Sequence, residues 1–403
     1  MPSIVVIGAG QAGASLVAKL REQGFTGAIT LIGEEPVPPY QRPPLSKKYL
    51  LGEMEVERLY LRPESFYDNN AIDLHLNETV TAIDRADMQV IAGGHAIAYD
   101  QLALTTGSVP RRLPGSVGGE LEGVHVIRNL KDVDTMAPEF TPGARVLIVG
   151  GGYIGLEAAA VAAEKGLEVT IVEMADRILK RVAAPETADY FRALHQSHGV
   201  EIREGTALQT LLGEDRVAGA RLGDGTEMEV DFVIVGVGIT PATGLAEAAG
   251  LEIEDGIRTD EFGRTSDPAI WAAGDCASFP LNGRQVRLES VPNAIDMAEC
   301  VGANMLGAQA PYVPKPWFWS DQYDVKLQIA GLNTGYDRVV VRPGDGAGQV
   351  SHWYYRGDEL LAVDAMNEPR AYMVGKRLIE AGKSPDPATI ADPGTELKAL
   401  LKA

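Results

Sequence analysis

The chain opens with a short apolar run that leads through glycines into a segment with helical periodicity. The apolar run spans residues 3–7, GAGQAG occupies residues 8–13, and the periodic segment covers residues 14–20. A continuous apolar run bounded by glycines is typical of a buried strand, and the periodic segment predicts a helix. A second predicted strand at residues 28–32 ends at Gly33-Glu34-Glu35. The start of the chain therefore predicts a strand–turn–helix–strand unit.

The glycines of this turn stand where the backbone has to approach a bound phosphate. Gly8 permits a tight turn, Gly10 lets the backbone reach a pyrophosphate, and Gly13 lets the helix pack on the strand. The pyrophosphate would bind the free N–H groups at the positive end of the helix dipole. Glu34 follows at about the expected 20 residues, where a carboxylate accepts hydrogen bonds from ribose hydroxyls. A single motif of this kind also fits an ordinary strand-to-helix turn.

The same pattern recurs later in the chain. Its parts are an apolar run at 145–149, GGGYIG at 150–155, a predicted helix at 156–165 and a predicted strand at 168–172. Gly150, Gly152 and Gly155 repeat the three glycine positions, and Glu173 follows the second strand. Two complete copies predict two dinucleotide sites in one chain.

A proline-rich segment at residues 36–52 follows the first acidic residues. Its prolines exclude a strand and predict an extended entry to a short helix that starts near Ser46. A surface loop is one interpretation. Because the segment follows Glu34, we expect it to lie along the bound nucleotide, with Arg42 and Lys47 within reach of it.

The pattern in the rest of the chain predicts three domains. The further expected elements are a hairpin at 87–99, strands at 99–108, 201–203, 232–235 and 270–273, helices at 130–136, 186–198 and 293–307, and a meander over 207–230. Strands at 326–329, 338–341, 350–355 and 360–364 and a helix at 369–381 complete the chain. We expect a discontinuous domain over 1–113 and 237–317, a second domain over 114–236, and an α+β domain over 318–403. The fold class is α/β with two Rossmann-like domains.

Asp275 follows the predicted strand 270–273 and a glycine, before a predicted helix. A carboxylate in that place can hydrogen-bond a polyol chain, or it can cap the helix. The pattern leaves both interpretations open.

Composition limits the classes of function. The chain has 403 residues and a formal net charge of -20, which argues against a nucleic-acid partner. No apolar run approaches the roughly 18 residues of a membrane span, and no signal peptide is visible, so we expect a cytoplasmic protein without membrane contact. Cys276 and Cys300 lack metal-ligand spacing and are expected to be reduced structural thiols. His195 and His198 could share a helix face, for which we expect a solvated surface rather than a metal site.

With these motifs in view, the chain resembles the FAD-dependent pyridine-nucleotide oxidoreductases, whose architecture is that of glutathione reductase. It is most similar to the NADH-dependent ferredoxin reductases that serve bacterial haem-thiolate monooxygenases or aromatic-ring dioxygenases. The segments that carry the resemblance are RPPLSK at 42–47, GGGYIGLE at 150–157, AGD at 273–275 and FWSDQY at 318–323.

The resemblance implies a role for each matched residue. In the FAD site, Gly8, Gly10 and Gly13 hold the pyrophosphate. Glu34 binds the adenosine ribose, with Glu35 as the alternative, and Asp275 binds the ribityl chain. The residues that line the cofactor are Arg42, Lys47, Val291, Pro292 and Trp319. In the NADH site, Gly150, Gly152 and Gly155 hold the pyrophosphate and Glu173 the ribose. Lys47 and Glu157 are the expected catalytic pair; helix-end charge complementarity is the other interpretation of Glu157.

The resemblance also implies a mechanism. NADH passes a hydride to flavin N5, and single electrons leave to an acidic 2Fe-2S ferredoxin that docks transiently on a local basic face. Related disulfide reductases need a pair of cysteines beside the flavin, and residues 38–50 contain none. Peroxidase-like members use a single cysteine where this chain has Arg42-Pro43-Pro44, so a thiol relay is disfavoured. The alternatives are a reductase of a ring dioxygenase, an NADH oxidase or peroxidase, and a flavoprotein whose NADH binding regulates assembly. We expect a monomer or a weak dimer.

Overall fold

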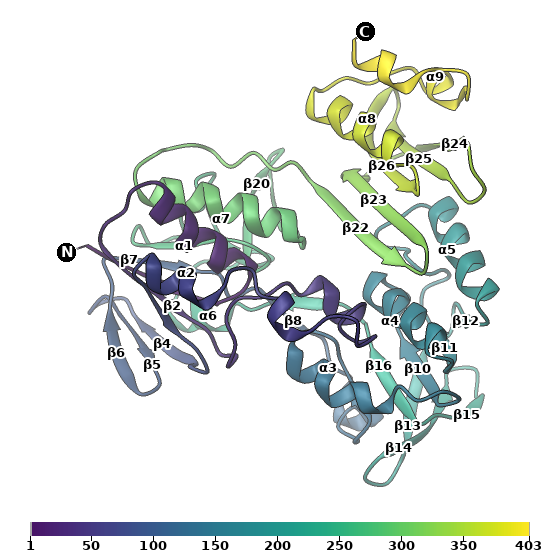
Figure 1. Cartoon of the computed structure of the whole chain (residues 1–403), viewed down its shortest axis with the longest axis horizontal. Coiled ribbons are helices and arrows are strands. Elements are labelled where there is room, and N and C mark those ends of the chain that lie inside the picture. Colours follow the sequence, from purple (N-terminus) through teal and green to yellow (C-terminus); the bar gives the residue numbers. More distant parts are fainter. Residues whose placement is uncertain (1, 403) are drawn as a thin grey trace. The chain divides into compact units, whose positions relative to one another are not determined.

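The computed structural model describes residues 2–402, which fold into two compact units (Figure 1). Unit 1 comprises Met1–Arg42, Glu55–Val109 and Ile239–Pro316, and unit 2 comprises Pro43–Met54, Pro110–Gly238 and Trp317–Ala403. The division of the sequence into three domains is not tested by these units and stays a prediction.

Unit 1 is built on a parallel sheet whose strand order is β19-β7-β1-β2-β3. The strands are β1 (Ser3–Ile7), β2 (Ala28–Ile32), β3 (Ile72–His75), β7 (Gln101–Leu104) and β19 (Ile270–Ala272). The register places Ile7 of β1 beside Ile32 of β2 and Leu104 of β7. Because the strands are parallel, their carboxyl ends meet at one edge of the sheet, and the first glycine turn leaves β1 at that edge.

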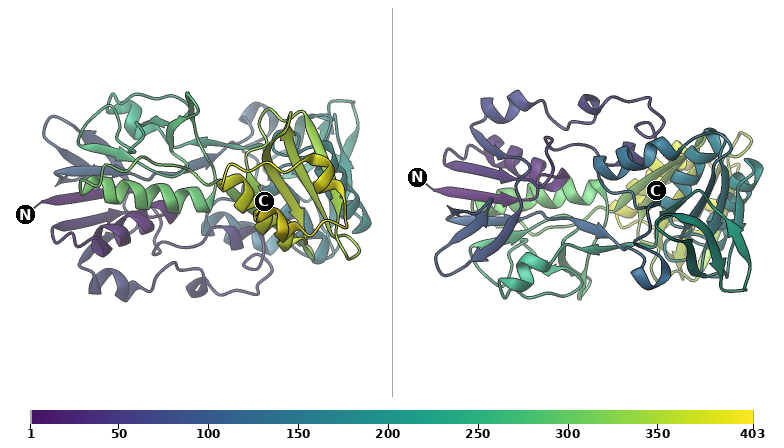
Figure 2. Two further views of the ribbon diagram at one scale, coloured as in Figure 1. Left: turned by 90° about the horizontal axis from the view of Figure 1, so that it is seen from above. Right: turned by 90° about the horizontal axis from the view of Figure 1, so that it is seen from below.

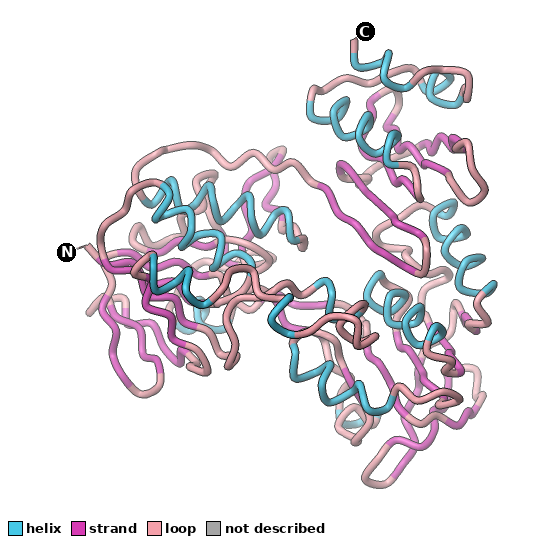
Figure 3. Tube along the Cα trace, viewed as in Figure 1, coloured by secondary structure: helices cyan, strands magenta, loops and turns pink. Residues whose placement is uncertain are grey.

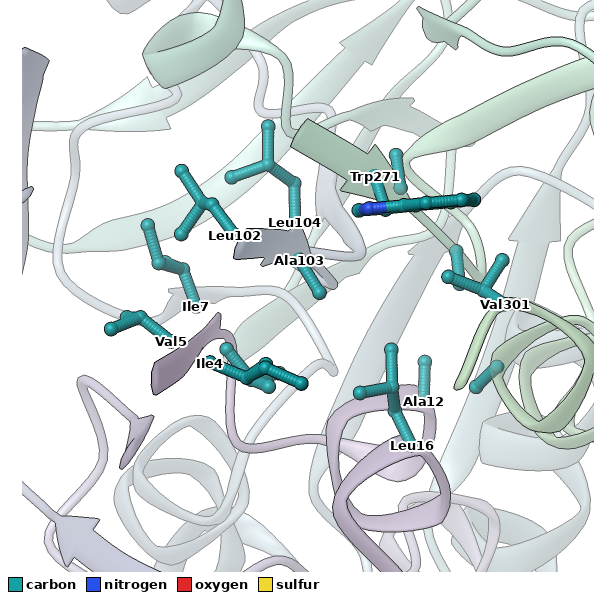
Figure 4. Packing of buried hydrophobic residues seen from close by; sticks show 14 of the residues in the cluster. Ile4, Val5, Ile7, Ala12, Leu16, Leu102, Ala103, Leu104, Trp271 and Val301 are labelled. Atoms are coloured by element: carbon teal, nitrogen blue, oxygen red, sulfur yellow. The ribbon is translucent and has the colours of Figure 1, made fainter. Parts of the chain in front are cut away.

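The core of unit 1 lies between this sheet and two helices, α1 (Gln11–Glu22) and α7 (Val291–Met305). Figure 4 shows Val5 and Leu102 of the sheet in the same cluster as Leu16 of α1 and Val301 of α7. The continuous apolar runs of β1 and β7 follow from this placement, because helices and further strands bury both faces of the sheet.

The remaining elements of unit 1 surround the parallel sheet. They are α2 (Glu64–Asn69), β4 (Val80–Asp84), β5 (Gln89–Ala92), β6 (His95–Ala98), β17 (Ile239–Pro241), α6 (Gly244–Ala248), β18 (Ile257–Arg258), β20 (Ala277–Leu281) and β21 (Arg284–Val286). Strand β8 (Ser108–Pro110) includes the last residues of this segment of unit 1 and the first residue of the next segment of unit 2. The hairpin predicted at 87–99 is confirmed as β5 and β6, with Gly93 and Gly94 in its turn.

Two predictions about the 270–307 region are wrong in detail. The residues after Asp275 form strand β20 instead of a helix, because they pair with β18 and β21 and are buried there. Asp275 is therefore not a helix cap. Helix α7 begins at Val291, two residues earlier than predicted, because the Ser290 hydroxyl caps it by accepting from the Asn293 N–H at 3.2 Å, and Pro292 fits a first helical turn.

Unit 2 contains a second parallel sheet, with strand order β12-β11-β10-β16-β9. Its strands are β9 (Val124–His125), β10 (Arg145–Val149), β11 (Glu168–Val172), β12 (Glu201–Arg203) and β16 (Phe232–Val235). The helices are α3 (Leu130–Met136), α4 (Tyr153–Glu164) and α5 (Pro185–Ser197). The predicted meander is confirmed as β13 (Leu208–Gly213), β14 (Val217–Leu222) and β15 (Glu227–Glu229).

The C-terminal part of unit 2 is an antiparallel sheet with order β22-β23-β26-β25-β24. The strands are β22 (Trp317–Gln322), β23 (Val325–Gly331), β24 (Arg338–Pro343), β25 (Val350–Arg356) and β26 (Glu359–Met366); helices α8 (Pro369–Glu380) and α9 (Pro387–Ala391) follow. Figure 2 shows α8 beside this sheet, and Figure 3 distinguishes its strands in magenta from the helix in cyan. The predicted strands and helix are confirmed, whereas β22 was not predicted from the aromatic segment.

The proline-rich segment differs from its prediction. A 3-10 helix spans Pro43–Ser46 and ends where a helix was expected to begin. Pro43 and Pro44 lack N–H groups and fit a first helical turn, so the turn starts at the prolines and not after them. Among the described residues 2–402, no helix is long and apolar enough to cross a membrane.

Candidate dinucleotide-binding sites

The first glycine turn has a shape that only glycine allows. Gly8 has a φ of +109°, and a Cβ there would collide with the carbonyl oxygen of Thr105. A Cβ at Gly13 would collide with the carbonyl oxygen of Gly8, so α1 packs directly on the turn. A Cβ at Gly10 would meet nothing within 4 Å. Gly10 precedes α1, and no side chain caps the helix there, so its first N–H groups are available to a phosphate.

The second glycine turn repeats this geometry in unit 2. Gly150 also has a φ of +109°, and a Cβ there would collide with the carbonyl oxygen of Gly236. A Cβ at Gly155 would collide with the carbonyl of Gly150, whereas one at Gly152 would meet nothing within 4 Å. Gly152 precedes α4 and carries no capping side chain. The residues of both turns therefore fit a bound dinucleotide.

Glu173 is held at the carboxyl end of β11 by backbone groups. One carboxylate oxygen accepts from the Gly151 N–H at 2.7 Å, and the other accepts from the Ala175 N–H at 2.8 Å. The carboxylate is thus fixed beside the second glycine turn, where a ribose would approach it.

In unit 1 the acidic residue after the second strand comes one position later than Glu173 does in unit 2. Gly33 directly follows β2 as Glu173 directly follows β11. A Cβ at Gly33 would collide with the side chain of Ala9, so position 33 cannot carry a carboxylate. Glu34, the next residue, is exposed, and Glu35 is partly buried.

Glu35 is engaged with Arg42 in an ion pair. Arg42 Nη2 lies 2.6 Å from Glu35 Oε1, and the Tyr40 hydroxyl donates to Glu35 Oε2 at 2.6 Å. The Arg42 guanidinium also lies 5.1 Å from the centre of the Tyr40 ring. Because these contacts occupy the Glu35 carboxylate, Glu34 is the acidic residue of the two that faces solvent.

Asp275 lies beside the start of α1. Gly274 has a φ of +82°, and a Cβ there would stand 3.0 Å from the Cβ of Ala12. The Ser108 hydroxyl donates to Asp275 Oδ2 at 3.0 Å and orients the carboxylate. Val291 and Pro292 form the first turn of α7, and a Cβ at Gly274 would also lie 3.8 Å from the Cβ of Ala294 in this helix. The structure thus gathers the predicted residues Asp275, Val291 and Pro292 around the starts of two helices.

Lys47 and Glu157 form an ion pair within unit 2. Lys47 Nζ lies 2.9 Å from Glu157 Oε1, and the Glu157 side chain is only 7% exposed. The hydroxyls of Ser320 and Ser46 donate to Oε1 and Oε2 at 2.7 and 2.8 Å. Burial raises the pKa of Glu157, and the Lys47 charge opposes that rise. The two serines were not predicted as site residues, although both stand in the segments RPPLSK and FWSDQY.

Trp319 belongs to β22, whose side chains alternate between two faces. Phe318 contacts the Tyr153 ring of α4 at 5.0 Å, and Ser320 reaches Glu157 on the same side. Trp317 and Trp319 face the other way and stack at 5.5 Å. The predicted residues Trp319, Lys47 and Glu157 all lie in unit 2.

The solvated surface predicted for His195 is wrong. His195 is completely buried, and its Nε2 lies 2.8 Å from Gln322 Oε1. Burial lowers its pKa to about 4. His198 is exposed and stacks on Tyr323 with ring centres 3.7 Å apart. His195 is buried because Gln322 of β22 and Tyr323 of the following turn contact it.

The two cysteines are free thiols. Cys276 is fully buried and Cys300 is partly buried, and burial raises the pKa of each thiol. Residues 2–402 contain no group of three or more His, Cys, Asp or Glu side chains that could hold a metal ion.

Comparison with known proteins finds matches along the whole chain. Residues 2–298 match the family described as pyridine nucleotide-disulphide oxidoreductase, and residues 317–401 match the family described as reductase C-terminal. Rhodocoxin reductase of Rhodococcus erythropolis is 42% identical over 99% of this chain and 94% of its own length. Putidaredoxin reductase CamA of Pseudomonas putida is 39% identical over 100% of this chain and 97% of its own length. The solved covalent putidaredoxin reductase–putidaredoxin complex superposes with a TM-score of 0.95 at 39% identity, covering 100% of this chain and 98% of that one.

Proposed function

The chain belongs to the pyridine nucleotide-disulphide oxidoreductase family, and we propose that it is an FAD-containing NADH:ferredoxin oxidoreductase that feeds a monooxygenase. The observation that carries this proposal is the pair of matched glycine turns, each with open space before an uncapped helix. Two such turns suit one tightly bound dinucleotide and one exchanging dinucleotide. The cofactors are FAD and NADH.

Each turn serves one dinucleotide in the proposal. For FAD, Gly8, Gly10 and Gly13 bind the pyrophosphate, Glu34 binds the ribose, Asp275 binds the ribityl chain, and Arg42, Lys47, Val291, Pro292 and Trp319 line the cofactor. For NADH, Gly150, Gly152 and Gly155 bind the pyrophosphate, and Glu173 binds the ribose. The support in this structure is the open space at Gly10 and Gly152 and the fixed carboxylates of Asp275 and Glu173.

When bound, FAD would supply the chemistry that accepts two electrons together as a hydride and releases them one at a time. The chain contributes orientation and charge. Lys47 balances negative charge on the cofactor and acts as a fixed cation, not as a proton base. Its ion pair with Glu157 fixes the position of the ammonium group. Lys47 and Glu157 are thus the proposed catalytic pair.

Electrons leave the cofactor without a thiol relay. Residues 36–52 contain no cysteine, and Cys276 is enclosed in the core of unit 1. A disulfide reductase or a peroxidase of this family type needs an accessible thiol, so direct transfer to a ferredoxin fits the residues better. No observation favours an NADH oxidase.

The partner is a 2Fe-2S ferredoxin of acidic character that binds transiently. Arg370 and Arg377 of α8 are exposed, which supports a basic docking face on this helix. Lys376 lies between them, 5.0 Å from the Trp317 ring centre, and pairs with Glu380 at 3.9 Å. Lys315 and Lys326 are also exposed. The protein is proposed to act in the cytoplasm as a monomer or a weak dimer.

Stopped-flow reduction by NADH followed by titration with 2Fe-2S ferredoxins tests the proposal. The FAD-reconstituted protein is expected to bleach with NADH and then to reduce ferredoxin in single-electron steps. Rapid oxygen consumption without stimulation by any ferredoxin would instead establish an oxidase. A protein that stays colourless after reconstitution with FAD would overturn the whole assignment.

A further inference from the structure

The Glu157 carboxylate is the end point of a chain of hydrogen bonds that begins at Tyr323. The groups in this chain are Tyr323, His195, Gln322, Ser320 and Glu157, and all belong to unit 2. They come from β22 and its following turn, from α5 and from α4. The function proposed above assigns no role to Ser320, Gln322, His195 or Tyr323.

The donors in this chain point in one direction. Gln322 Oε1 can only accept, so the His195 Nε2 atom, 2.8 Å away, carries the proton and donates. The other ring nitrogen of neutral His195, Nδ1, then accepts from the Tyr323 hydroxyl at 3.2 Å. The orientation of the first two bonds is therefore fixed by the chemistry of the amide and the imidazole.

The same direction continues to the carboxylate. Gln322 Nε2 donates to the Ser320 hydroxyl oxygen at 3.1 Å. Ser320 accepts that bond and directs its own single O–H proton to Glu157 Oε1 at 2.7 Å. Successive bonds with aligned donors polarise one another, so the last donor is a stronger partner for an anion than an isolated serine.

Burial makes this support necessary. Ser320 and His195 are completely buried, and Glu157 is 6% exposed. A carboxylate in such surroundings is stable as an anion only when it is paired and hydrogen-bonded. Lys47 supplies the charge, and the hydroxyls of Ser46 and Ser320 supply the hydrogen bonds.

We propose that Ser320 is a positioning residue that keeps Glu157 ionised, at the end of the directed chain Tyr323–His195–Gln322–Ser320. An ionised Glu157 holds the Lys47 ammonium in place, whereas a protonated Glu157 would release it. The inference rests on the proposed function only where it links Lys47 to the flavin.

The charged surroundings of Glu157 are simple enough for a direct titration. Lys47 is the charge that acts on the carboxylate, and the 3-10 helix and β22 add the neutral Ser46 and Ser320. The buried stretches of β10 and β11 beneath α4, Val146–Val149 and Val169–Val172, carry no charged residue. A change in the protonation of Glu157 therefore reports on its hydrogen bonds.

Infrared titration of the FAD-bound protein tests the proposal. The carboxyl band assigned by Glu157→Gln is followed with pH in wild type, Ser320→Ala and Ser320→Thr. Loss of one hydrogen bond to a charged group is expected to raise the pH at which Glu157 takes up its proton by about one unit in Ser320→Ala. Ser320→Thr keeps the hydroxyl and should titrate as wild type does.

A matched control and a second measurement separate positioning from general damage. Ser351→Ala removes another buried serine hydroxyl of the same sheet, one that accepts from Trp353 Nε1 at 3.0 Å, and should leave the titration unchanged. The midpoint potential of bound FAD should become more negative in Ser320→Ala, because a protonated Glu157 no longer holds the Lys47 ammonium where it balances negative charge on the cofactor. In a Glu157→Gln background, Ser320→Ala should shift the potential no further.

Three results would overturn the proposal: an unchanged titration in Ser320→Ala, an equal shift in Ser351→Ala, or a further shift of potential in the Glu157→Gln background. The titration requires neither NADH nor ferredoxin. A shifted titration in a protein that reduces no ferredoxin would therefore refute the proposed function and leave the hydrogen-bond chain standing.

Discussion

The Glu173 carboxylate accepts a hydrogen bond from the Gly151 N–H at 2.7 Å, which joins the acidic end of β11 to the second glycine turn. The second oxygen of the carboxylate accepts from Ala175 at 2.8 Å. An anion fixed in this way favours a free ribose 2′-hydroxyl and repels a 2′-phosphate. Two cations follow Glu173 in the sequence: Lys180 pairs with Asp176 at 2.9 Å, and Arg177 contacts the carbonyl oxygens of Ile178 and Lys180 at 3.5 Å.

Glu173→Ala is therefore expected to narrow the preference for NADH over NADPH. The ratio of the two kcat/KM values should fall by about tenfold, which matches the loss of one hydrogen bond to a charged group. Glu168→Ala, at the exposed opposite end of β11, is the matched control and should not change the ratio. A wild-type protein that used NADPH and NADH equally well would contradict the role of Glu173.

Gly10 and Gly152 allow the binding of FAD and the binding of NADH to be weakened separately. Gly10 and Gly152 have extended backbones that alanine adopts readily, and a Cβ at either position meets no protein atom within 4 Å. The added methyl group would occupy the space of the pyrophosphate. Gly10→Ala is expected to fold but to lose FAD affinity, whereas Gly152→Ala should keep FAD and bind NADH less tightly.

Each loss should be about tenfold or more, which corresponds to about 1.4 kcal/mol. The FAD content after gel filtration and the KM for NADH measure the two effects. Gly244→Ala, where a Cβ also meets nothing within 4 Å, should alter neither. Equal losses of both cofactors in Gly10→Ala and Gly152→Ala would contradict the assignment of one dinucleotide to each turn.

The sequence predicts the two parallel sheets well because their strands are buried on both faces. The runs at β1 and β10 are apolar throughout, and glycines end them, so local pattern and tertiary position agree. Strand β22 was not predicted because its two faces have different partners. Phe318 packs on Tyr153, and Trp317 packs on the Tyr372 ring at 6.4 Å, so no alternation of apolar and polar residues appears.

The partners of Glu157 could not be predicted for a related reason. Ser46 lies 111 residues and Ser320 lies 163 residues from it in the chain, and only folding brings them together. His195 was expected in solvent because its neighbours in sequence are polar, yet Gln322 covers it from another part of unit 2. Local pattern identifies the glycine turns because their chemistry is local; it does not identify a buried polar network.

A buried carboxylate in the C-terminal sheet predicts how stability depends on pH. Asp364 Oδ2 accepts from the Thr187 hydroxyl at 2.8 Å and from the Tyr354 hydroxyl, and burial raises the pKa of Asp364 to about 6 from its ordinary 3.8. A group whose pKa is raised by folding stabilises the folded state below the unfolded pKa, and this contribution is lost as the pH rises through the folded pKa.

Asp364→Asn is therefore expected to gain stability relative to wild type as the pH rises from about 4 to about 7, by on the order of 2 kcal/mol. His352 contacts Thr187 at 2.7 Å, and burial lowers the pKa of this histidine to about 4. Its contribution to the stability of the folded state is therefore lost as the pH falls, whereas that of Asp364 is lost as the pH rises. Urea unfolding followed by tryptophan fluorescence, to which Trp353 buried in β25 contributes, measures the difference. A difference between the two proteins that is independent of pH would contradict the raised pKa.

The exposed face of α8 predicts how the ferredoxin binds. Arg370 and Arg377 stand seven residues apart, on one side of the helix, and Met373 between them is 46% exposed. Neither arginine makes an ion pair with any of the residues 2–402 that the structure describes. Two exposed cations beside an apolar side chain suit an acidic partner, although Glu368 interacts with Arg370 and the whole chain is strongly acidic.

Arg370→Ala combined with Arg377→Ala is expected to slow ferredoxin association by about tenfold at low salt and to weaken its dependence on ionic strength. Reduction of the flavin by NADH should stay unchanged, because neither arginine belongs to the proposed nucleotide sites. Arg221→Ala combined with Arg258→Ala removes the same charge from exposed positions that carry ion pairs, and serves as the control. Stopped-flow electron transfer from the reduced protein to ferredoxin, measured over a range of salt concentrations, distinguishes a local docking face from an effect of net charge.

If both double variants slowed association equally, the overall charge and not α8 would govern the encounter. If salt had no effect on the wild-type rate, electrostatic steering would be absent, and the face on α8 would not be the docking site.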